Sequence, residues 1–272
     1  GVIFFRHFYT GVVAARLAAF VAEVRKSGNA IRGEAVCRRS EMQCIKCHSI
    51  AGSGGKVGPD LISIGASAPI DYLIESLIEP NKKIKENFHS LVIQTDKGKV
   101  YTGIPVQQSK QVVVLRTAEG ATIRIPTATI DVKQQGRSLM AQGAVDSLTR
   151  NELVDLTRFL SELGKVGRFA VSKAEIARTW EALLPTPAGI HRIRRSSFDS
   201  VAKGDKAFKW HAAFSRVSGQ LPTNGLPVLR DATYVTKRGR SRTSFVRCRL
   251  NVTSDGKVEL VLGDTAGLSM WI

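Results

Sequence analysis

Two cysteines and a histidine lie within five consecutive residues of this 272-residue chain, in the run Cys44-Ile45-Lys46-Cys47-His48. This C-x-x-C-H pattern is typical of covalent haem attachment, in which each thiol adds to a vinyl group of one porphyrin. The histidine then stands on the same turn, where it can bind the iron from one face. No other feature of the sequence restricts the fold as much, because a chain that carries a haem here has to fold around it.

Two other kinds of site use the same spacing of cysteines. A thioredoxin-like redox pair would follow a strand in a βαβ unit, and a zinc site would need a second Cys/His pair. The remaining cysteines, Cys37 and Cys248, form no such pair, and we interpret both as buried apolar residues rather than as a disulfide. We therefore expect one covalent haem c, attached at Cys44 and Cys47, with His48 as an axial iron ligand.

A second axial ligand is usual in electron-transfer haem proteins, and a methionine thioether raises the reduction potential. The chain has three methionines. Met42 lies too close to Cys44 to reach the opposite face of the haem, and Met270 lies in a distant strand-like segment. Met140 is therefore the candidate ligand. A lone methionine is more commonly a core residue, and this alternative stays open here.

An amphipathic helix is expected after Met140. Its N-cap is Ser147 or Thr149, and Glu152 stands three residues after Thr149, as a capping box requires. Apolar residues then recur at helical spacing until Gly164 ends the run; they are Leu153, Leu156, Phe159, Leu160 and Leu163. A first helix is expected upstream of the cysteines, around Gly33 to Cys37.

The stretch from Gly33 to about Gly164 resembles a class I cytochrome c. Gly58-Pro59-Asp60-Leu61, which begins ten residues after His48, matches the Gly-Pro loop of that family. The resemblance implies that the carbonyl of Pro59 accepts a hydrogen bond from His48 and orients its ring. It also implies that Met140 is the second iron ligand.

Two positions depart from the family. Members pack a small residue and an aromatic of the first helix across the C-terminal helix. Gly33 fits the small residue, whereas Cys37 stands in the place of the aromatic. Ala141 replaces the proline that commonly follows the ligand methionine. Neither departure removes a ligand.

Met140 lies ninety-two residues after His48, which is further than in a small cytochrome c. The surplus is rich in β-branched residues and predicts strands at 88–95, 99–107, 111–117 and 121–132. Three of its segments resemble the haem-binding domain of the Pirellula/Verrucomicrobium type, which occurs in large bacterial proteins with dehydrogenase-like modules; they are Ile78-Glu79-Pro80-Asn81-Lys82, Val100-Tyr101-Thr102-Gly103 and Ser138-Leu139-Met140.

We expect a multidomain α+β chain. Residues 1–30 are interpreted as the helical tail of an upstream module, with an amphipathic helix at 13–27. Residues 31–166 are an all-α cytochrome c core with a small antiparallel β insert at about 88–135. Residues 167–272 are a β-sandwich-like accessory domain. Both ends look cut, so we interpret the chain as a fragment. The apolar run at 2–20 is interrupted by Arg6, His7 and Arg16, too often for a transmembrane span.

Within the last domain, the patterns predict a helix at 171–184 and strands at 207–214, 244–253 and 257–263. A hairpin is expected at Ser254-Asp255-Gly256. Three tryptophans, Trp180, Trp210 and Trp271, suit core positions better than a carbohydrate-stacking platform, which remains the weaker alternative.

The chain carries a net charge of +17. Residues 1–167 hold 22 Lys/Arg against 15 Asp/Glu (+7), and residues 168–272 hold 18 against 8 (+10). The densest cluster, at 237–242, lacks a recognition helix or an RNA-binding aromatic motif, so we expect a solvated loop and no nucleic acid. A positive surface suits an acidic redox partner or an anionic membrane surface.

These observations predict an electron-transfer module that is not itself a complete enzyme. Electrons would come from a dehydrogenase module of the same polypeptide or from a partner protein, outside the cytoplasmic membrane or in the periplasm. One alternative is a ligand-binding or peroxidatic haem with an open sixth position, for which His89 and His191 are other conceivable ligands. Another is an adhesive or carbohydrate-binding protein with a structural haem.

Overall fold

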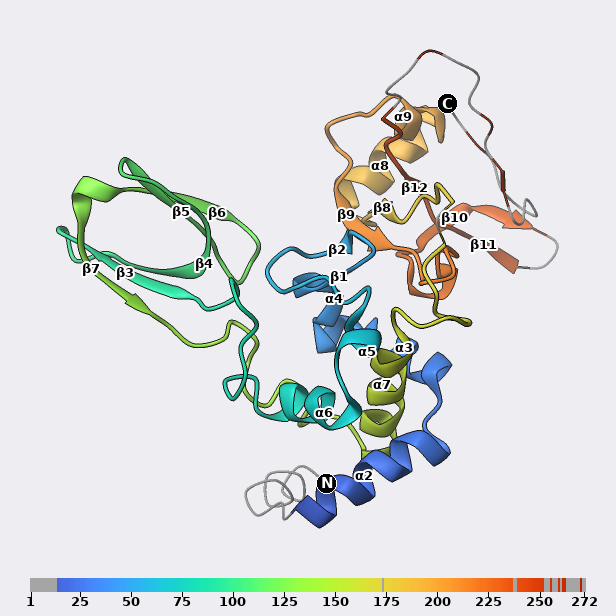
Figure 1. Ribbon diagram of the computed structural model, residues 1–272. Helices are drawn as coiled ribbons and strands as arrows, with labels where there is room; N and C mark the ends of the chain where they lie inside the picture. The colour runs from blue at the N-terminus through green and yellow to red at the C-terminus, as the bar shows by residue number, and fades with distance from the viewer. Residues whose placement is uncertain are drawn as a thin grey trace. The chain divides into compact units, whose positions relative to one another are not determined.

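The computed structural model describes residues 14–172, 174–236 and 239–251, with single residues beyond them. It is a mixed α+β structure in which helices that pack together come first, followed by antiparallel sheets of five and three strands (Figure 1). The chain divides into two compact units. The N-terminal unit comprises residues 1–176 and 216–218, and the C-terminal unit comprises residues 177–215 and 219–272.

Helices form one part of the N-terminal unit. They are α2 (Ala14–Ser27), α3 (Ala30–Cys37), the 3-10 turn η1 (Ser40–Met42), α4 (Cys44–Cys47), α5 (Ile64–Ser67), α6 (Ile70–Ile78) and α7 (Arg150–Glu162). Helix α7 is the centre of this group, because α2, α3, α5 and α6 all contact it. None of the described helices has the length and apolar character needed to cross a membrane.

The start and end of α7 are those that its sequence predicts. The hydroxyl of Thr149 accepts a hydrogen bond from the backbone of Glu152, whose carboxylate accepts one from the backbone of Thr149. This is the predicted capping box. Gly164, with φ +82°, follows the last turn. The apolar face of α7 is buried, with Phe159 and Leu163 fully inaccessible.

Helix α3 crosses α7 at Gly33. A Cβ atom on Gly33 would lie 1.9 Å from the carbonyl oxygen of Asp155 and 2.8 Å from Cβ of Phe159. The two backbones therefore approach to a distance that only glycine allows. Asp155 also accepts hydrogen bonds from the backbone N–H of Asn29 (2.7 Å) and from Nε of Arg32 (2.6 Å), which fixes the start of α3 on α7.

A five-stranded antiparallel sheet is inserted between α6 and α7. Its strands are β3 (Leu91–Thr95), β4 (Val100–Gln108), β5 (Val112–Arg116), β6 (Thr122–Pro126) and β7 (Ile130–Gln135), in the order β6-β5-β4-β3-β7. The sheet curls strongly (Figure 1) and encloses a small core of Ile93, Val113, Leu115 and Ile125. The expected single strand at 121–132 is wrong. It is two strands separated by the 3-10 turn η2 (Thr127–Thr129), because the chain leaves β5 after Pro126 and crosses to pair with β3.

The C-terminal unit contains a three-stranded sheet in the order β12-β8-β9 and a hairpin of two further strands. The elements are β8 (Thr179–Leu183), α8 (Pro187–Ser196), α9 (Asp199–Ala202), β9 (Trp210–Phe214), the 3-10 turn η3 (Thr223–Gly225), β10 (Leu229–Thr236), β11 (Gly239–Thr243) and β12 (Val246–Arg247). One core holds them together; it includes Leu183, Ile193, Val201, Phe208, Leu229 and Phe245.

The helix expected at 171–184 is wrong. Residues 179–183 are the central strand of the three-stranded sheet, because β9 and β12 lie on either side and supply hydrogen-bond partners that the local pattern cannot reveal. The strands expected at 207–214 and 244–253 appear as the shorter β9 and β12. The hairpin at 254–256, the strand at 257–263 and Trp271 lie largely or wholly outside the described residues, as does most of the apolar run at 2–20.

Candidate functional site

The C-x-x-C-H run forms one helical turn followed by an extended residue. Helix α4 begins after Gln43, which is left-handed (φ 53°), and the backbone N–H of His48 donates to the carbonyl of Cys44 (2.7 Å). The elements before it, α3 and η1, are helical, so the strand that precedes a thioredoxin-like redox pair is missing here. Among the described residues, no cluster of three or more His, Cys, Asp or Glu side chains is placed to hold a metal ion.

The ring of His48 is held in one tautomer. Its Nδ1 lies 2.8 Å from the carbonyl oxygen of Pro59, the contact that the Gly-Pro resemblance implies. A carbonyl oxygen only accepts, so Nδ1 carries the proton and Nε2 keeps its lone pair. No hydrogen bond joins Nε2 to any described residue. Burial lowers the pKa of His48, which favours the neutral ring that a metal requires.

Gly58 lies against the face of the His48 ring. A Cβ atom on Gly58 would lie 2.5 Å from Cε1 and 2.6 Å from Nδ1 of His48. The backbone N–H groups of Val57 and Gly58 both donate to the carbonyl of Cys47, at 3.0 and 2.8 Å. The loop therefore wraps closely around the end of α4, and glycine is needed where it meets the imidazole.

Asp60 fixes the loop that presents Pro59. Its carboxylate accepts hydrogen bonds from Oγ of Ser49 (2.8 Å) and from three backbone N–H groups, those of Ala51 (3.2 Å), Gly52 (2.7 Å) and Ile62 (2.8 Å). Burial raises the pKa of Asp60, but the hydrogen bonds outweigh it and the net pKa is lowered. The sequence places Asp60 beside Pro59 without revealing this role.

Cys37 is the last residue of α3 and is 1% exposed. Interaction with the side chain of Cys44, followed by burial, raises the pKa of Cys37, whereas interaction with Cys37 lowers the pKa of Cys44. The thiol of Cys44 donates to the carbonyl of Met42 (3.7 Å). Burial raises the pKa of Cys47. Cys37 is buried, as its interpretation as an apolar residue requires, whereas Cys248 is half-buried in the C-terminal unit.

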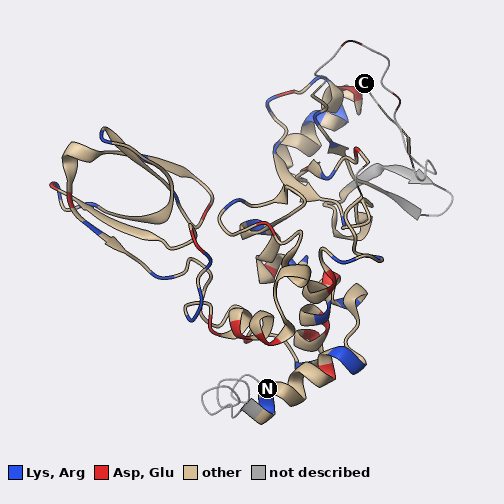
Figure 2. Cartoon of the chain, in the orientation of Figure 1, with Lys and Arg blue, Asp and Glu red and all other residues tan. Residues whose placement is uncertain are grey.

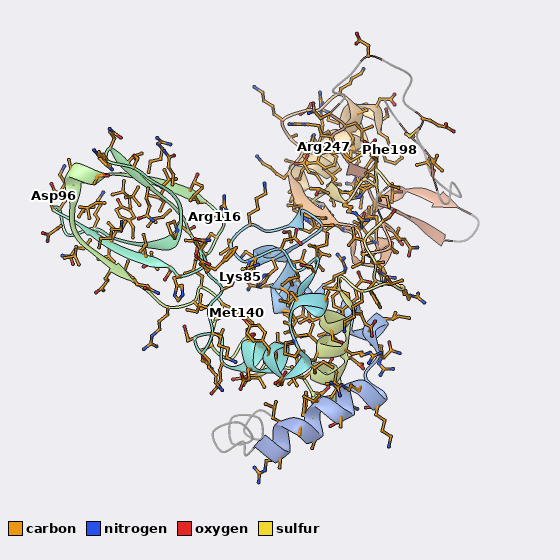
Figure 3. All side chains as sticks on the ribbon, in the orientation of Figure 1. Lys85, Asp96, Arg116, Met140, Phe198 and Arg247 are labelled. Atoms are coloured by element: carbon orange, nitrogen blue, oxygen red, sulfur yellow. The ribbon has the colours of Figure 1, made fainter. Side chains whose placement is uncertain are left out.

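Met140 lies on the segment that returns from the β insert to α7 (Figure 3). It is half-buried, and its backbone N–H donates to Oγ of Ser138 (3.1 Å). The segment is tied to the chain after α6, because the backbone N–H of Ser138 donates to Oδ1 of Asn81 (3.0 Å) and Nε2 of Gln142 donates to the carbonyl of Ile78 (2.8 Å).

The other conceivable ligands lie elsewhere. Met42 is buried, with its sulfur 4.0 Å from Oγ of Ser147, and Met270 is 53% exposed. His89 pairs with Gln135 within the insert (2.6 Å), and His191 is exposed on α8 of the C-terminal unit. Within the N-terminal unit, Met140 therefore remains the candidate for a second axial ligand.

The insert contacts the loop after the C-x-x-C-H run. Nη1 of Arg116, at the end of β5, donates to the carbonyl of Lys56 (2.7 Å; Figure 3). Lys and Arg occur along both units, whereas Asp and Glu are conspicuous on α6 and α7 (Figure 2). The side chains of the basic cluster at 237–242 lie outside the described residues.

The two described tryptophans have structural partners. Nε1 of Trp180 donates to the carbonyl of Ala177 (3.0 Å) and to Oγ of Ser215 (2.9 Å). Trp210 packs against the core of the C-terminal unit, and the guanidinium of Arg247 lies 4.2 Å from its ring centroid. Trp180 and Trp210 therefore both occupy positions that suit side-chain packing within the C-terminal unit.

Comparison of the sequence with models of known families and with curated proteins gives no match.

Proposed function

We propose that the N-terminal unit is a c-type cytochrome domain that carries one covalent haem and transfers electrons. The observation that carries this proposal is the state of the His48 ring. Pro59 fixes its tautomer, Gly58 lies flat against it, and no described residue makes a hydrogen bond to Nε2, directly after two cysteines at the spacing of thioether attachment. The class I cytochrome c resemblance of the same residues supports it.

Each residue has a defined part in this proposal. Cys44 and Cys47 would form the thioethers, and His48 would bind the iron through Nε2. Pro59 orients His48, and Met140 would supply the second iron ligand, which would favour a raised reduction potential. When bound, the haem supplies a one-electron carrier that alternates between ferric and ferrous iron. The helices around α7 would exclude water from it.

The wider proposal follows from the same resemblance. The donor is a dehydrogenase module of the same polypeptide or a partner protein, and the domain works in the periplasm or elsewhere outside the cytoplasmic membrane. The C-terminal unit is a β-sandwich-like accessory domain, which its two antiparallel sheets support. The net charge of +17 supports an acidic redox partner or an anionic membrane surface as the binding partner.

Spectroscopy of the full chain matured with c-type haem tests the proposal. We expect haem that survives denaturation in acid, and a low-spin ferric spectrum with the weak long-wavelength band of thioether ligation. Met140→Ala should lose that band and become high-spin, whereas Met270→Ala, which changes an exposed methionine, should leave it unchanged. Absence of covalent haem would contradict the proposal. A high-spin wild type, unaffected by Met140→Ala, would instead indicate an open sixth position and a ligand-binding or peroxidatic site.

A further inference from the structure

We propose that Asn81 and Gln142 are positioning residues that hold Met140 where it can bind the haem iron. They act through the segment that carries Met140 and are not ligands themselves. The two tethers rest on the structure alone. Their consequence for the iron rests on the proposed function, in which Met140 is the second ligand.

Met140 stands on a stretch of chain between β7, which ends at Gln135, and α7, which begins at Arg150. Residues 136–149 are all described, and they form turns but no helix or strand. Side chains on loops are held less precisely than those on helices or strands. The position of the Met140 thioether therefore depends on the hydrogen bonds that fasten this stretch to the rest of the N-terminal unit.

Asn81 fastens the stretch on the N-terminal side of Met140. Its Oδ1 accepts a hydrogen bond from the backbone N–H of Ser138 (3.0 Å). Oγ of Ser138 in turn accepts one from the backbone N–H of Met140 (3.1 Å). Because a backbone N–H only donates, the oxygen of the Asn81 amide has to face Ser138. Two hydrogen bonds in series thus lead from Asn81 to the backbone of Met140.

Gln142 fastens the stretch on the C-terminal side of Met140. Its Nε2 donates a hydrogen bond to the carbonyl of Ile78 (2.8 Å), the last residue of α6. The last four carbonyls of an α-helix have no partner within the helix, so this bond also satisfies an unpaired acceptor. Ser138 and Gln142 each lie two residues from Met140, and both bond to the run 78–81. Met140 is therefore held from both sides at the same end of α6.

The end of α6 is itself fixed in the unit. Leu73, Ile74 and Leu77 of this helix are buried, and α6 contacts α7. Pro80, which lies between the two anchor points, is buried as well. The two tethers therefore fix Met140 relative to the helices that pack around α7.

Hydrogen exchange of the purified full chain tests the tether at Asn81. We expect the Ser138 amide to exchange about fivefold faster in Asn81→Ala than in the wild type, measured at residue resolution by NMR. Asn81→Asp keeps an oxygen acceptor and should restore the wild-type rate. Asn151→Ala, which removes an exposed asparagine of α7, should not change it. A wild-type rate in Asn81→Ala would overturn the tether, as would an unprotected Ser138 amide in the wild type.

Competition by imidazole tests the consequence for the iron. Imidazole added to the ferric, haem-matured chain has to displace Met140, and it does so more easily when Met140 is in place for a smaller fraction of the time. Asn81→Ala and Gln142→Ala should each lower the apparent dissociation constant of imidazole about fivefold, measured by loss of the thioether band. Asn81→Asp should restore the wild-type value. Gln134→Ala, at an exposed position of β7, should have no effect.

The positioning role and the proposed function fail in different ways. If Asn81→Ala and Gln142→Ala unfold at a lower temperature but bind imidazole like the wild type, the two residues are merely structural and the positioning role is overturned. Covalent haem without the thioether band in the wild type would overturn ligation by Met140, and with it the positioning role. Absence of covalent haem would overturn the proposed function and the consequence for the iron, while the exchange rates would still decide the tether.

Discussion

Nδ1 of His48 and the carbonyl oxygen of Pro59, eleven positions further along the chain, lie 2.8 Å apart in a hydrogen bond that closes a loop. The bond is made by the backbone of Pro59, so a side-chain substitution there does not delete it. The structure instead offers two residues that control this hydrogen bond: Gly58, through the space beside the ring, and Asp60, through the hydrogen bonds of the loop.

Gly58 controls the space beside the ring. Gly58→Ala would place a methyl group 2.5 Å from Cε1 of His48, so the imidazole has to move and its hydrogen bond to Pro59 is lost. We expect the haem-matured variant to contain much less covalent, low-spin haem than the wild type, measured by absorbance per chain. Gly225→Ala, whose new methyl group meets nothing within 4 Å, is the matched control. Equal haem content in the two variants would contradict this role for Gly58.

Asp60 controls the loop itself. Asp60→Ala removes four hydrogen bonds and should lower the free energy of unfolding by about 1–3 kcal/mol. Asp131→Ala, at an exposed position of β7, should have little effect. Urea unfolding of both variants measures the difference, and similar losses would show that Asp60 does not hold the loop.

The lowered pKa of Asp60 also predicts a pH dependence. A carboxylate with a lowered folded-state pKa stabilises the fold fully above its unfolded-state pKa, which is about 3.9. That stability is lost as the pH falls through the folded-state pKa. Asp60→Asn should therefore lose less stability than the wild type between neutral pH and the acid range, measured as the difference in unfolding midpoint. Parallel pH profiles would refute the expectation.

In Gly33→Ala, helix propensity and packing change the free energy of unfolding in opposite directions. Helix propensity alone makes a Gly→Ala change in α3 stabilising, by about 0.8–1.0 kcal/mol. The 1.9 Å approach to the carbonyl of Asp155 makes Gly33→Ala an overpacking change, which costs about 1–3 kcal/mol. We expect destabilisation, measured by thermal unfolding. Ala35→Ser, exposed on the same helix, should stay within about 0.5 kcal/mol of the wild type. If Gly33→Ala instead unfolded at a higher temperature than the wild type, α3 and α7 would have to be able to move apart.

The cap of α7 can be tested separately. Thr149→Ala removes the side chain that accepts from the backbone of Glu152, and should cost about 1 kcal/mol of stability. Ser147→Ala, two residues upstream, removes only a 4.0 Å contact with the sulfur of Met42 and should cost less. Calorimetry of the two variants compares them directly, and the opposite order would place the cap at Ser147.

Local patterns predict the elements that depend on local contacts. The capping box and the leucine spacing define α7, and turn residues delimit β3, β4 and β5. Helix α8 was missed, although Thr186 caps it and Pro187 stands at its first position, a signal that the sequence contains. The helix expected at 171–184 failed because β8 depends on neighbours that are distant in sequence.

The candidate site likewise contains some residues that local sequence patterns mark and others that only the folded structure reveals. The spacing of Cys44, Cys47 and His48, and the Gly-Pro sequence that follows, mark the site from the sequence alone. The role of Asp60 does not follow from spacing, because it depends on how the loop folds back. Tertiary placement gives this residue its partners.

The insert enters and leaves its sheet at one place. The backbone N–H of Gly136 donates to the carbonyl of Ser90 (2.7 Å), and Oγ of Ser90 donates to the carbonyl of Arg137 (2.6 Å), across 47 residues of chain. These hydrogen bonds hold the two ends of the insert together, so the connection between α6 and α7 is as short in space as a hairpin turn. Since closure entropy depends on the length of flexible chain, the sheet adds little to the cost of bringing α7 onto α3. The insert can therefore be replaced as a unit. With a short turn in its place, we expect the helices to pack together in a shorter continuous chain, of the length of a small cytochrome c.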